Sequence, residues 1–129
     1  MAEGTLKISQ DHVWVQTHDD GARVGISDFA AEALGTIIYV ELPEVGDEVS
    51  KDEPFAAVES GKANVELPAP ITGTVLKVNE ELEDAPDLMN QDSFTKGWIA
   101  VLAIQDATEL DELMSKADYE LFVAGAEEG

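Results

Sequence analysis

One lysine lies where a side-chain amine could be chemically modified. Lys62 stands in the run VESGKANVE, between two short stretches rich in β-forming residues, with Gly61 directly before it. The pattern predicts a β-hairpin tip over residues 59–66, with the amine exposed and charged. An exposed amine does not suit Schiff-base catalysis, which needs a desolvated lysine, but it suits acylation by another protein. From the local sequence alone, a solubilising turn residue is the alternative.

The residue types that several other chemistries need are missing. The chain has no cysteine, which excludes disulfides, thiolate catalysis and cysteine-based metal sites. Its two histidines, His12 and His18, are six residues apart, which fits neither one helix face nor a common zinc pattern, so we interpret them as turn or surface residues. The sequence also lacks a Ser-His-Asp motif and a glycine-rich phosphate loop. We therefore expect no metal site and no catalytic centre.

The charge of the chain is strongly negative. Its 129 residues contain 28 Asp plus Glu against 7 Lys plus Arg, a formal net charge of −21. This balance argues against nucleic acid or an anionic membrane as a partner. Two explanations stay open: electrostatic steering toward basic partner enzymes, and solubility in a salty cytoplasm. No apolar run is long enough to span a membrane and no secretory signal is evident, so a cytoplasmic protein is expected.

Short β-prone runs separated by turn residues dominate the chain. Alternating apolar and polar residues on either side of the sequence DDG predict a hairpin with strands over residues 13–16 and 23–26. The run TIIYVELP predicts a strand that ends at Pro43, and GWIAVLAI predicts another. Residues 83–95 follow no regular period. The fold class is therefore mostly β.

Two segments have helical character. A two-turn helix is expected over residues 28–34, because Ser27 can cap its first turn. A C-terminal helix is expected over about residues 108–122, capped by Asp106 or Thr108. Its apolar residues recur at helical spacing: Leu110, Leu113, Met114 and Ala117.

Over nearly its whole length the chain resembles the H protein of the glycine cleavage system. The runs HVWV, VGISDFAAEALGTIIYVELPEVGDEV, AVESGKA, GTVLKVNEELEDAP, LMNQDSFTKGW and LDELM occur in the order and spacing of that family. On these runs the chain is identified as a member of the H or H-like group. The resemblance implies one domain over residues 1–129 with a lipoyl-type hybrid barrel-sandwich fold: two small antiparallel sheets, short helices and a C-terminal helix. Biotin carriers share this architecture, but methionines typically flank their lysine, and Gly61 and Ala63 flank this one.

The resemblance also implies roles for particular residues. Lys62 would carry covalent lipoate as a swinging arm, and the protein itself would be a non-catalytic shuttle. Glu59 would be read by the lipoate ligase or lipoyl transferase, and Gly61 leaves the approach to the lysine open. Glu66 matches a family carboxylate that helps to shelter an aminomethyl cargo, and Phe29 would face the cleft of the arm. Dihydrolipoamide dehydrogenase would be a further partner.

One departure from the family pattern bears on the cargo. The family usually has a glutamate in a His-Glu-Trp run near the N-terminus, whereas this chain has Val13 between His12 and Trp14. Valine cannot bind an amine. We therefore expect an H-like lipoate-binding protein that serves a non-glycine system, such as sulfur oxidation with a heterodisulfide-reductase-like complex. The alternative is a genuine glycine cleavage H protein that carries the aminomethyl group from glycine decarboxylase to the aminomethyltransferase. A carrier-like module whose lysine stays unmodified is the third reading.

Overall fold

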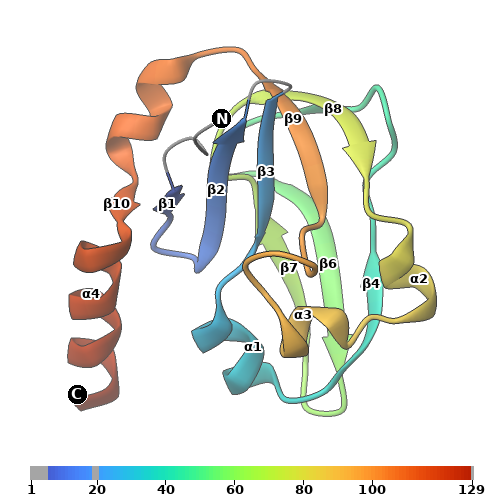
Figure 1. Ribbon diagram of the computed structural model, residues 1–129, viewed down its shortest axis with the longest axis vertical. Coiled ribbons are helices and arrows are strands. Elements are labelled where there is room, and N and C mark those ends of the chain that lie inside the picture. The colour runs from blue at the N-terminus through green and yellow to red at the C-terminus, as the bar shows by residue number, and fades with distance from the viewer. Residues whose placement is uncertain (1–5, 19–20, 129) are drawn as a thin grey trace.

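The structure, a computed structural model, describes residues 6–18 and 21–128, which form two antiparallel sheets with helices at their edges (Figure 1). The larger sheet has seven strands in the order β10-β1-β2-β3-β9-β8-β5. Their bounds are Leu6–Ile8 for β1, Val13–His18 for β2, Gly21–Ile26 for β3, Glu48–Val49 for β5, Gly73–Val78 for β8, Ala100–Ile104 for β9 and Met114–Ser115 for β10. The smaller sheet has the order β4-β6-β7, with bounds Ile37–Glu41, Pro54–Ser60 and Asn64–Pro68.

Five helical segments of the described residues accompany the sheets. They are α1 at Asp28–Leu34, α2 at Glu81–Asp84, α3 at Leu88–Gln91, the 3-10 helix η1 at Ala107–Glu112, and α4 at Lys116–Glu128. Helices α1 and α3 lie together at one end of the molecule, next to the loop that joins β6 to β7, whereas α4 stands at the edge beside β1 and β10 (Figure 1).

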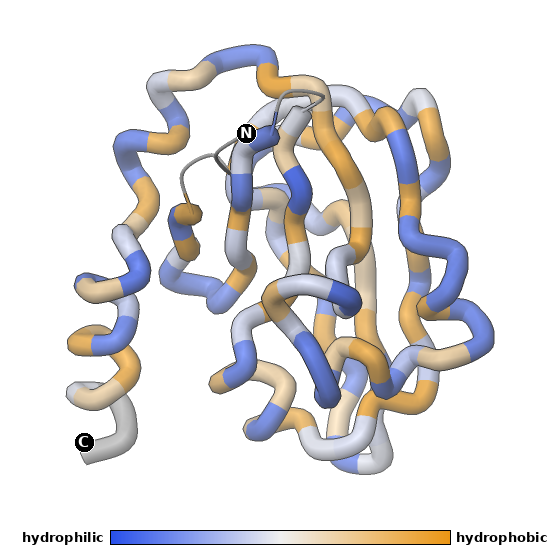
Figure 2. Tube along the Cα trace, viewed as in Figure 1, coloured by the Kyte–Doolittle hydropathy of each residue, from blue (hydrophilic) through white to orange (hydrophobic). Residues whose placement is uncertain are grey.

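The core lies between the two sheets. Apolar side chains of both sheets, such as Val15, Val24 and Leu102 from the larger and Val40 and Val58 from the smaller, are at most 3% exposed and belong to one cluster. Figure 2 shows the matching sequence pattern, in which hydrophobic and hydrophilic residues alternate along many strands. Burial of these side chains is the main stabilising term, at about 25 cal/mol per Å² of apolar surface. The mostly β sandwich with a C-terminal helix agrees with the predicted fold class.

Several predicted elements have the expected bounds or nearly so. Helix α1 covers residues 28–34 as predicted, and the Ser27 hydroxyl accepts a hydrogen bond from the Ala30 amide at 3.2 Å. The hairpin strands β2 and β3 are longer than expected, because their ladder continues to the pair His18–Gly21. The turn residues 19–20 lie outside the described residues.

The irregular segment after β8 contains two helices that the sequence did not indicate. Both α2 and α3 have only four residues, so neither shows a helical period that a pattern search could find. Each is anchored by one fully buried side chain, Leu82 in α2 and Met89 in α3. Tertiary packing therefore places these two turns.

The expected single helix over about residues 108–122 is wrong in its bounds. Asp106 caps only the short 3-10 helix η1, and the chain is extended at Leu113. Met114 and Ser115 then pair with β1 as strand β10, and α4 begins at Lys116. The open edge of β1 takes up backbone hydrogen bonds that a continuous helix would have kept, which is a tertiary effect that local propensity does not contain.

Candidate functional site

The turn that carries Lys62 is held by the serine that precedes it. Ser60 is 5% exposed, and its hydroxyl oxygen accepts hydrogen bonds from the amides of Lys62, at 3.1 Å, and Ala63, at 3.2 Å. Its own amide donates to the Ala63 carbonyl at 2.9 Å. These bonds fix the backbone of the turn between β6 and β7, while residues 61–64 are exposed. The turn itself is narrower than the predicted tip.

The Lys62 side chain is exposed and leans over the end of helix α1. A Cβ atom built on Gly35 would lie 3.5 Å from Cε and 3.9 Å from Nζ of Lys62. Gly35 has a φ of 80°, a left-handed conformation that favours glycine, and it ends α1. Among the residues that the structure describes, none forms a hydrogen bond or ion pair with Lys62 Nζ. The amine is therefore open to an acylating enzyme, and the end of the Lys62 side chain lies near Gly35.

Glu59 and Glu66 lie together on the outer face of the smaller sheet. The strand register places Glu59 between Tyr39 and Asn64, and it places Ala57 between Glu41 and Glu66. The small Ala57 leaves the sheet surface hollow between the two longer side chains that flank it.

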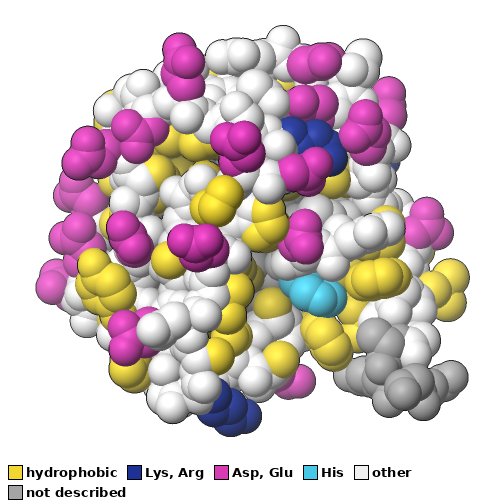
Figure 3. Space-filling view, turned by 180° about the vertical axis from the view of Figure 1, so that it is seen from behind, with side chains coloured by type: hydrophobic (Ala, Val, Ile, Leu, Met, Phe, Trp, Pro, Cys, Tyr) yellow, Lys and Arg dark blue, Asp and Glu magenta, His cyan; other side chains and the backbone are white. Residues whose placement is uncertain are grey.

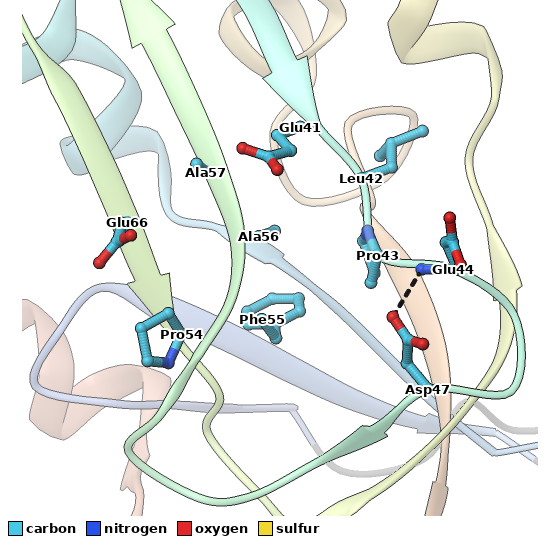
Figure 4. A pocket seen from close by; sticks show the side chains of 10 residues that line it. All are labelled: Glu41, Leu42, Pro43, Glu44, Asp47, Pro54, Phe55, Ala56, Ala57 and Glu66. Atoms are coloured by element: carbon cyan, nitrogen blue, oxygen red, sulfur yellow. Dashed lines mark hydrogen bonds between the residues drawn. The ribbon is translucent and has the colours of Figure 1, made fainter.

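This hollow continues along the sheet face as a cavity of about 370 Å³ (Figure 4). Its carboxylates come from three segments: Glu41, Glu44, Asp47 and Glu66. The Asp47 carboxylate also accepts a hydrogen bond from the Glu44 amide at 3.0 Å, which shapes the loop before β5. Glu66 therefore lines this cavity with further acidic residues, whereas Glu59 lines a neighbouring hollow of the same face together with Glu41 and Glu66.

Phe29 lies at the other end of α1, away from Gly35. Its ring centroid is 5.2 Å from that of His12, and it lines a cavity of about 230 Å³ between α1 and α4 together with Phe94 and Tyr119. Phe29 is thus separated from the Lys62 end by the length of the helix, about 9 Å at 1.5 Å per residue.

His12 lies in the turn before β2, which agrees with the predicted turn position, but it is half-buried and belongs to a chain of polar side chains. Its Nδ1 lies 2.7 Å from the Tyr119 hydroxyl, which in turn lies 2.7 Å from the Ser27 hydroxyl. Burial lowers the pKa of His12, although the charge of Asp11 works in the opposite direction. Burial raises the pKa of Tyr119, and its hydrogen bond to Ser27 opposes this. A neutral imidazole and a protonated phenol result, which can share one hydrogen bond.

Val13 lies in the core. It is 0% exposed, pairs with Ile26 across the β2–β3 ladder and belongs to the cluster between the sheets. Its neighbour Trp14 is 1% exposed and donates from Nε1 to the Ser93 carbonyl at 2.8 Å, as expected for a core tryptophan. A buried valine at position 13 is explained by packing, without any change of cargo.

The molecular surface is acidic over a wide area. Figure 3 shows Asp and Glu side chains spread over the face that it presents, with few Lys or Arg among them. Among the described residues, no group of three or more potential ligands is arranged to hold a metal ion. Every helix in that part of the chain is too short or too polar to cross a lipid bilayer.

Comparison with known proteins points to one family. The family model for the glycine cleavage H-protein matches residues 6–125. The glycine cleavage system H protein of Bacillus licheniformis is 50% identical over 115 residues, which cover 89% of this chain and 91% of that protein. The corresponding protein of Halalkalibacterium halodurans is 49% identical over 119 residues, covering 92% of this chain and 93% of its own.

A solved structure gives the same result. The crystal structure of a glycine cleavage system H protein from Mycobacterium marinum superposes with a TM-score of 0.80 at 33% identity, covering 90% of this chain and 94% of the other. These relatives give no support to the sulfur cargo that Val13 suggested, nor to a heterodisulfide-reductase-like partner. They favour the alternative, a glycine cleavage H protein.

Proposed function

Because the chain belongs to the glycine cleavage H-protein family, we propose that it carries the aminomethyl group from glycine decarboxylase to the aminomethyltransferase on a lipoyl group attached to Lys62. Proteins of this family are non-catalytic carriers with lipoate covalently attached to a lysine. The attached group supplies a dithiolane on a long flexible tether. The protein supplies the attachment point, its presentation and a surface for the partner enzymes.

The geometry of the turn is the observation that carries this proposal. Ser60 holds the backbone on both sides of Lys62, so the position of the amine varies through its side chain only. The amine has no partner among the described residues, and Gly61 has no atoms near the place where its Cβ would lie. An acylating enzyme can therefore reach the lysine without first breaking an interaction of the protein. A lysine that served only solubility would not need a turn fixed by a buried serine.

Loss of the amine tests the attachment site. The protein and its Lys62→Arg variant are incubated with a lipoate ligase, lipoate and ATP, and intact masses are measured. We expect the wild type to gain one lipoyl group and the variant to gain none, with equal unfolding midpoints because the side chain is exposed. Modification of the arginine variant would show that another lysine is the attachment point.

A second experiment tests the cargo. The lipoylated protein is mixed with glycine decarboxylase and glycine, and its mass is recorded before and after addition of an aminomethyltransferase with tetrahydrofolate. We expect an aminomethyl adduct that the transferase then removes. A fully lipoylated protein that forms no adduct would reject the glycine role while leaving the carrier role in place. The same sample treated with a persulfide donor tests the sulfur alternative.

A further inference from the structure

We propose that Ile38 and Tyr39 form the apolar anchor of a docking surface on the outer face of the smaller sheet, and that its occupant is a basic surface of the enzyme that acylates Lys62. The inference rests on the proposed role of Lys62 as the attachment point. It adds a place where that enzyme binds, apart from the amine on which it acts.

The two anchor residues are exposed although they are large and apolar. Ile38 is 55% exposed and Tyr39 is 56% exposed, whereas Ile37 and Val40 on either side of them are at most 3% exposed. Successive side chains of a regular strand point to opposite faces, so one of two consecutive residues would be expected to face the core. Contiguous apolar surface that a fold leaves in solvent is typical of a protein interaction site.

A β-bulge accounts for this exposure. In the pairing of β4 with β6, Ile37 lies opposite Ser60. The next pair is Tyr39 with Glu59, so Ile38 is an extra residue of β4. A bulge interrupts the alternation of faces along a strand and re-aims the side chains next to it. The exposure of the pair is therefore set by the pairing of the two strands and not by the conformation of a single side chain.

The anchor lies next to the lysine turn. Tyr39 is the cross-strand neighbour of Glu59, and Cα atoms of such neighbours are about 5 Å apart. Glu59 precedes Lys62 by three residues, so their Cα atoms are at most about 11 Å apart. A stable protein interface takes in about 20–30 residues of each partner. An enzyme that covers Lys62 from the side of the smaller sheet therefore covers the anchor as well.

Carboxylates surround the anchor. Tyr39 lines a hollow of about 260 Å³ whose walls carry three of them, Glu41, Glu59 and Glu66. Glu41 and Glu66 lie on the two strands that flank Ala57 (Figure 4). In the part of the chain that the structure describes, no cation forms an ion pair with these three glutamates. An apolar anchor with an acidic rim is complementary to an apolar pocket rimmed by Lys or Arg.

Charge also argues against a second copy of this chain as the occupant. A twofold dimer would place the same face against itself, so that the acidic rims of the two copies would meet. Like charges that face each other across an interface are unfavourable, and the whole chain has a formal net charge of −21. A tyrosine ring, in contrast, can stack with an arginine side chain of a basic partner.

The test is the kinetics of lipoylation by a lipoate ligase at saturating lipoate and ATP, with the wild type, Tyr39→Thr, Ile38→Thr and Leu121→Gln as substrates. Threonine preserves the β preference of the strand. Leu121 is 73% exposed on α4, on the other side of the molecule from β4 (Figure 1), and its exchange is the matched control.

The expected change is in KM. Tyr39→Thr should raise KM for the protein substrate about tenfold and Ile38→Thr about threefold, because a central aromatic residue carries much of the binding energy of an interface. The kcat should stay within about twofold of the wild type, since neither side chain belongs to the acylated residue. Leu121→Gln should keep the wild-type KM.

Ionic strength tests the charge of the partner. Raising KCl from about 0.05 M to about 0.3 M should raise KM of the wild type several-fold, because salt screens exposed charges. Screening acts on all exposed carboxylates together, whereas loss of a single one changes little. Tyr39→Thr should show the same relative rise, since it removes apolar surface and no charge. A wild-type KM that does not depend on salt would overturn the assignment of a basic partner.

The other outcomes also decide. A KM of Tyr39→Thr equal to that of Leu121→Gln would overturn the proposal, and so would a lower kcat at unchanged KM, because that would indicate a distorted lysine turn. If Tyr39→Thr does not fold, Ile38→Thr decides by the same criterion. A wild-type dimer in sedimentation equilibrium that either anchor variant dissociates would assign the face to a second copy. A wild type that gains no lipoyl group at Lys62 would reject the proposed function, whereas normal lipoylation with equal KM values would reject the docking surface alone.

Discussion

The two ends of helix α1 are built in opposite ways. At the Gly35 end, the helix ends at a glycine, and the side-chain amide of Asn90 donates hydrogen bonds to backbone carbonyls there. The nearby Lys62 amine has no partner in the described part of the chain. At the Ser27 end, side chains from three distant segments form a hydrogen-bonded chain, in which Ser27 and Tyr119 are buried and His12 is half-buried.

The two ends differ because one contacts a buried side chain of α4 and the other lies beside an exposed lysine. The Ser27 end attaches α4 to the body of the protein, and a buried hydroxyl such as that of Tyr119 is stable only when it is hydrogen-bonded. The Gly35 end faces Lys62, whose proposed role as the attachment point requires an amine that has no partner in the protein. One short helix thus separates a rigid attachment from a free one. The first three experiments below test that separation, and the last tests the sheet face beside the lysine turn.

The largest effect is expected at the rigid end. Tyr119→Ala removes a ring that is 3% exposed together with its bonds to His12 and Ser27, and should cost about 3–5 kcal/mol in urea unfolding. Tyr119→Phe keeps the ring and should cost only about 1–2 kcal/mol. Under folding conditions neither change should alter the lipoylation rate of Lys62. A lower rate in Tyr119→Phe would mean that the two ends of α1 are coupled.

Loss of the serine that holds the lysine turn should have an intermediate effect. Ser60→Ala leaves the amides of Lys62 and Ala63 without their acceptor and should cost about 1–2 kcal/mol in unfolding. It should also lower kcat/KM for lipoylation, because the amine is then presented by a looser turn. Ser60→Thr keeps the hydroxyl and serves as the control. Equal lipoylation of all three proteins would show that the turn is not preorganised by Ser60.

The histidine at the rigid end predicts a pH dependence. Burial lowers the pKa of His12 below its ordinary value of 6.5, so the unfolded chain binds this proton more readily than the folded one. The contribution of neutral His12 to the free energy of unfolding is therefore present above pH 6.5, and it is lost as the pH falls through the pKa of His12 in the folded protein. His12→Asn tolerates the positive φ of 71° and removes the titration. As the pH is lowered through this range, the free energy of unfolding should fall more steeply for the wild type than for His12→Asn. Parallel curves for the two proteins would contradict the expectation.

The smallest effects are expected on the acidic sheet face. Glu59→Gln and Glu66→Gln each remove one carboxylate from a group without an ion-pair partner among the described residues, so both should change stability by less than about 0.5 kcal/mol. Only Glu59→Gln should slow lipoylation, if a ligase reads the acid three residues before the lysine. Equal rates for the two variants would remove Glu59 from the recognised surface.

Local sequence predicted the elements whose signals are complete within a few residues. The cap residue Ser27 and the terminating Gly35 predict helix α1, and a glycine between two β-prone runs predicts the lysine turn. These signals are local because they act through neighbouring backbone atoms. The extended sequence match also predicted the sandwich and the family. The four-residue helices and the true start of α4 could not be predicted, since packing and strand pairing decide them.

By itself the sequence determined that one lysine is presented at a hairpin tip of an acidic, cysteine-free β protein, because charge, composition and turn chemistry are properties of the chain. Only the tertiary structure decided what surrounds that lysine. It brought Asn90 under the end of α1, joined His12 to Tyr119, and put Val13 into the core, where its side chain packs and does not face a cargo. Contacts between segments tens of residues apart leave no periodic trace in the sequence, and the three-dimensional packing of the sheets creates them.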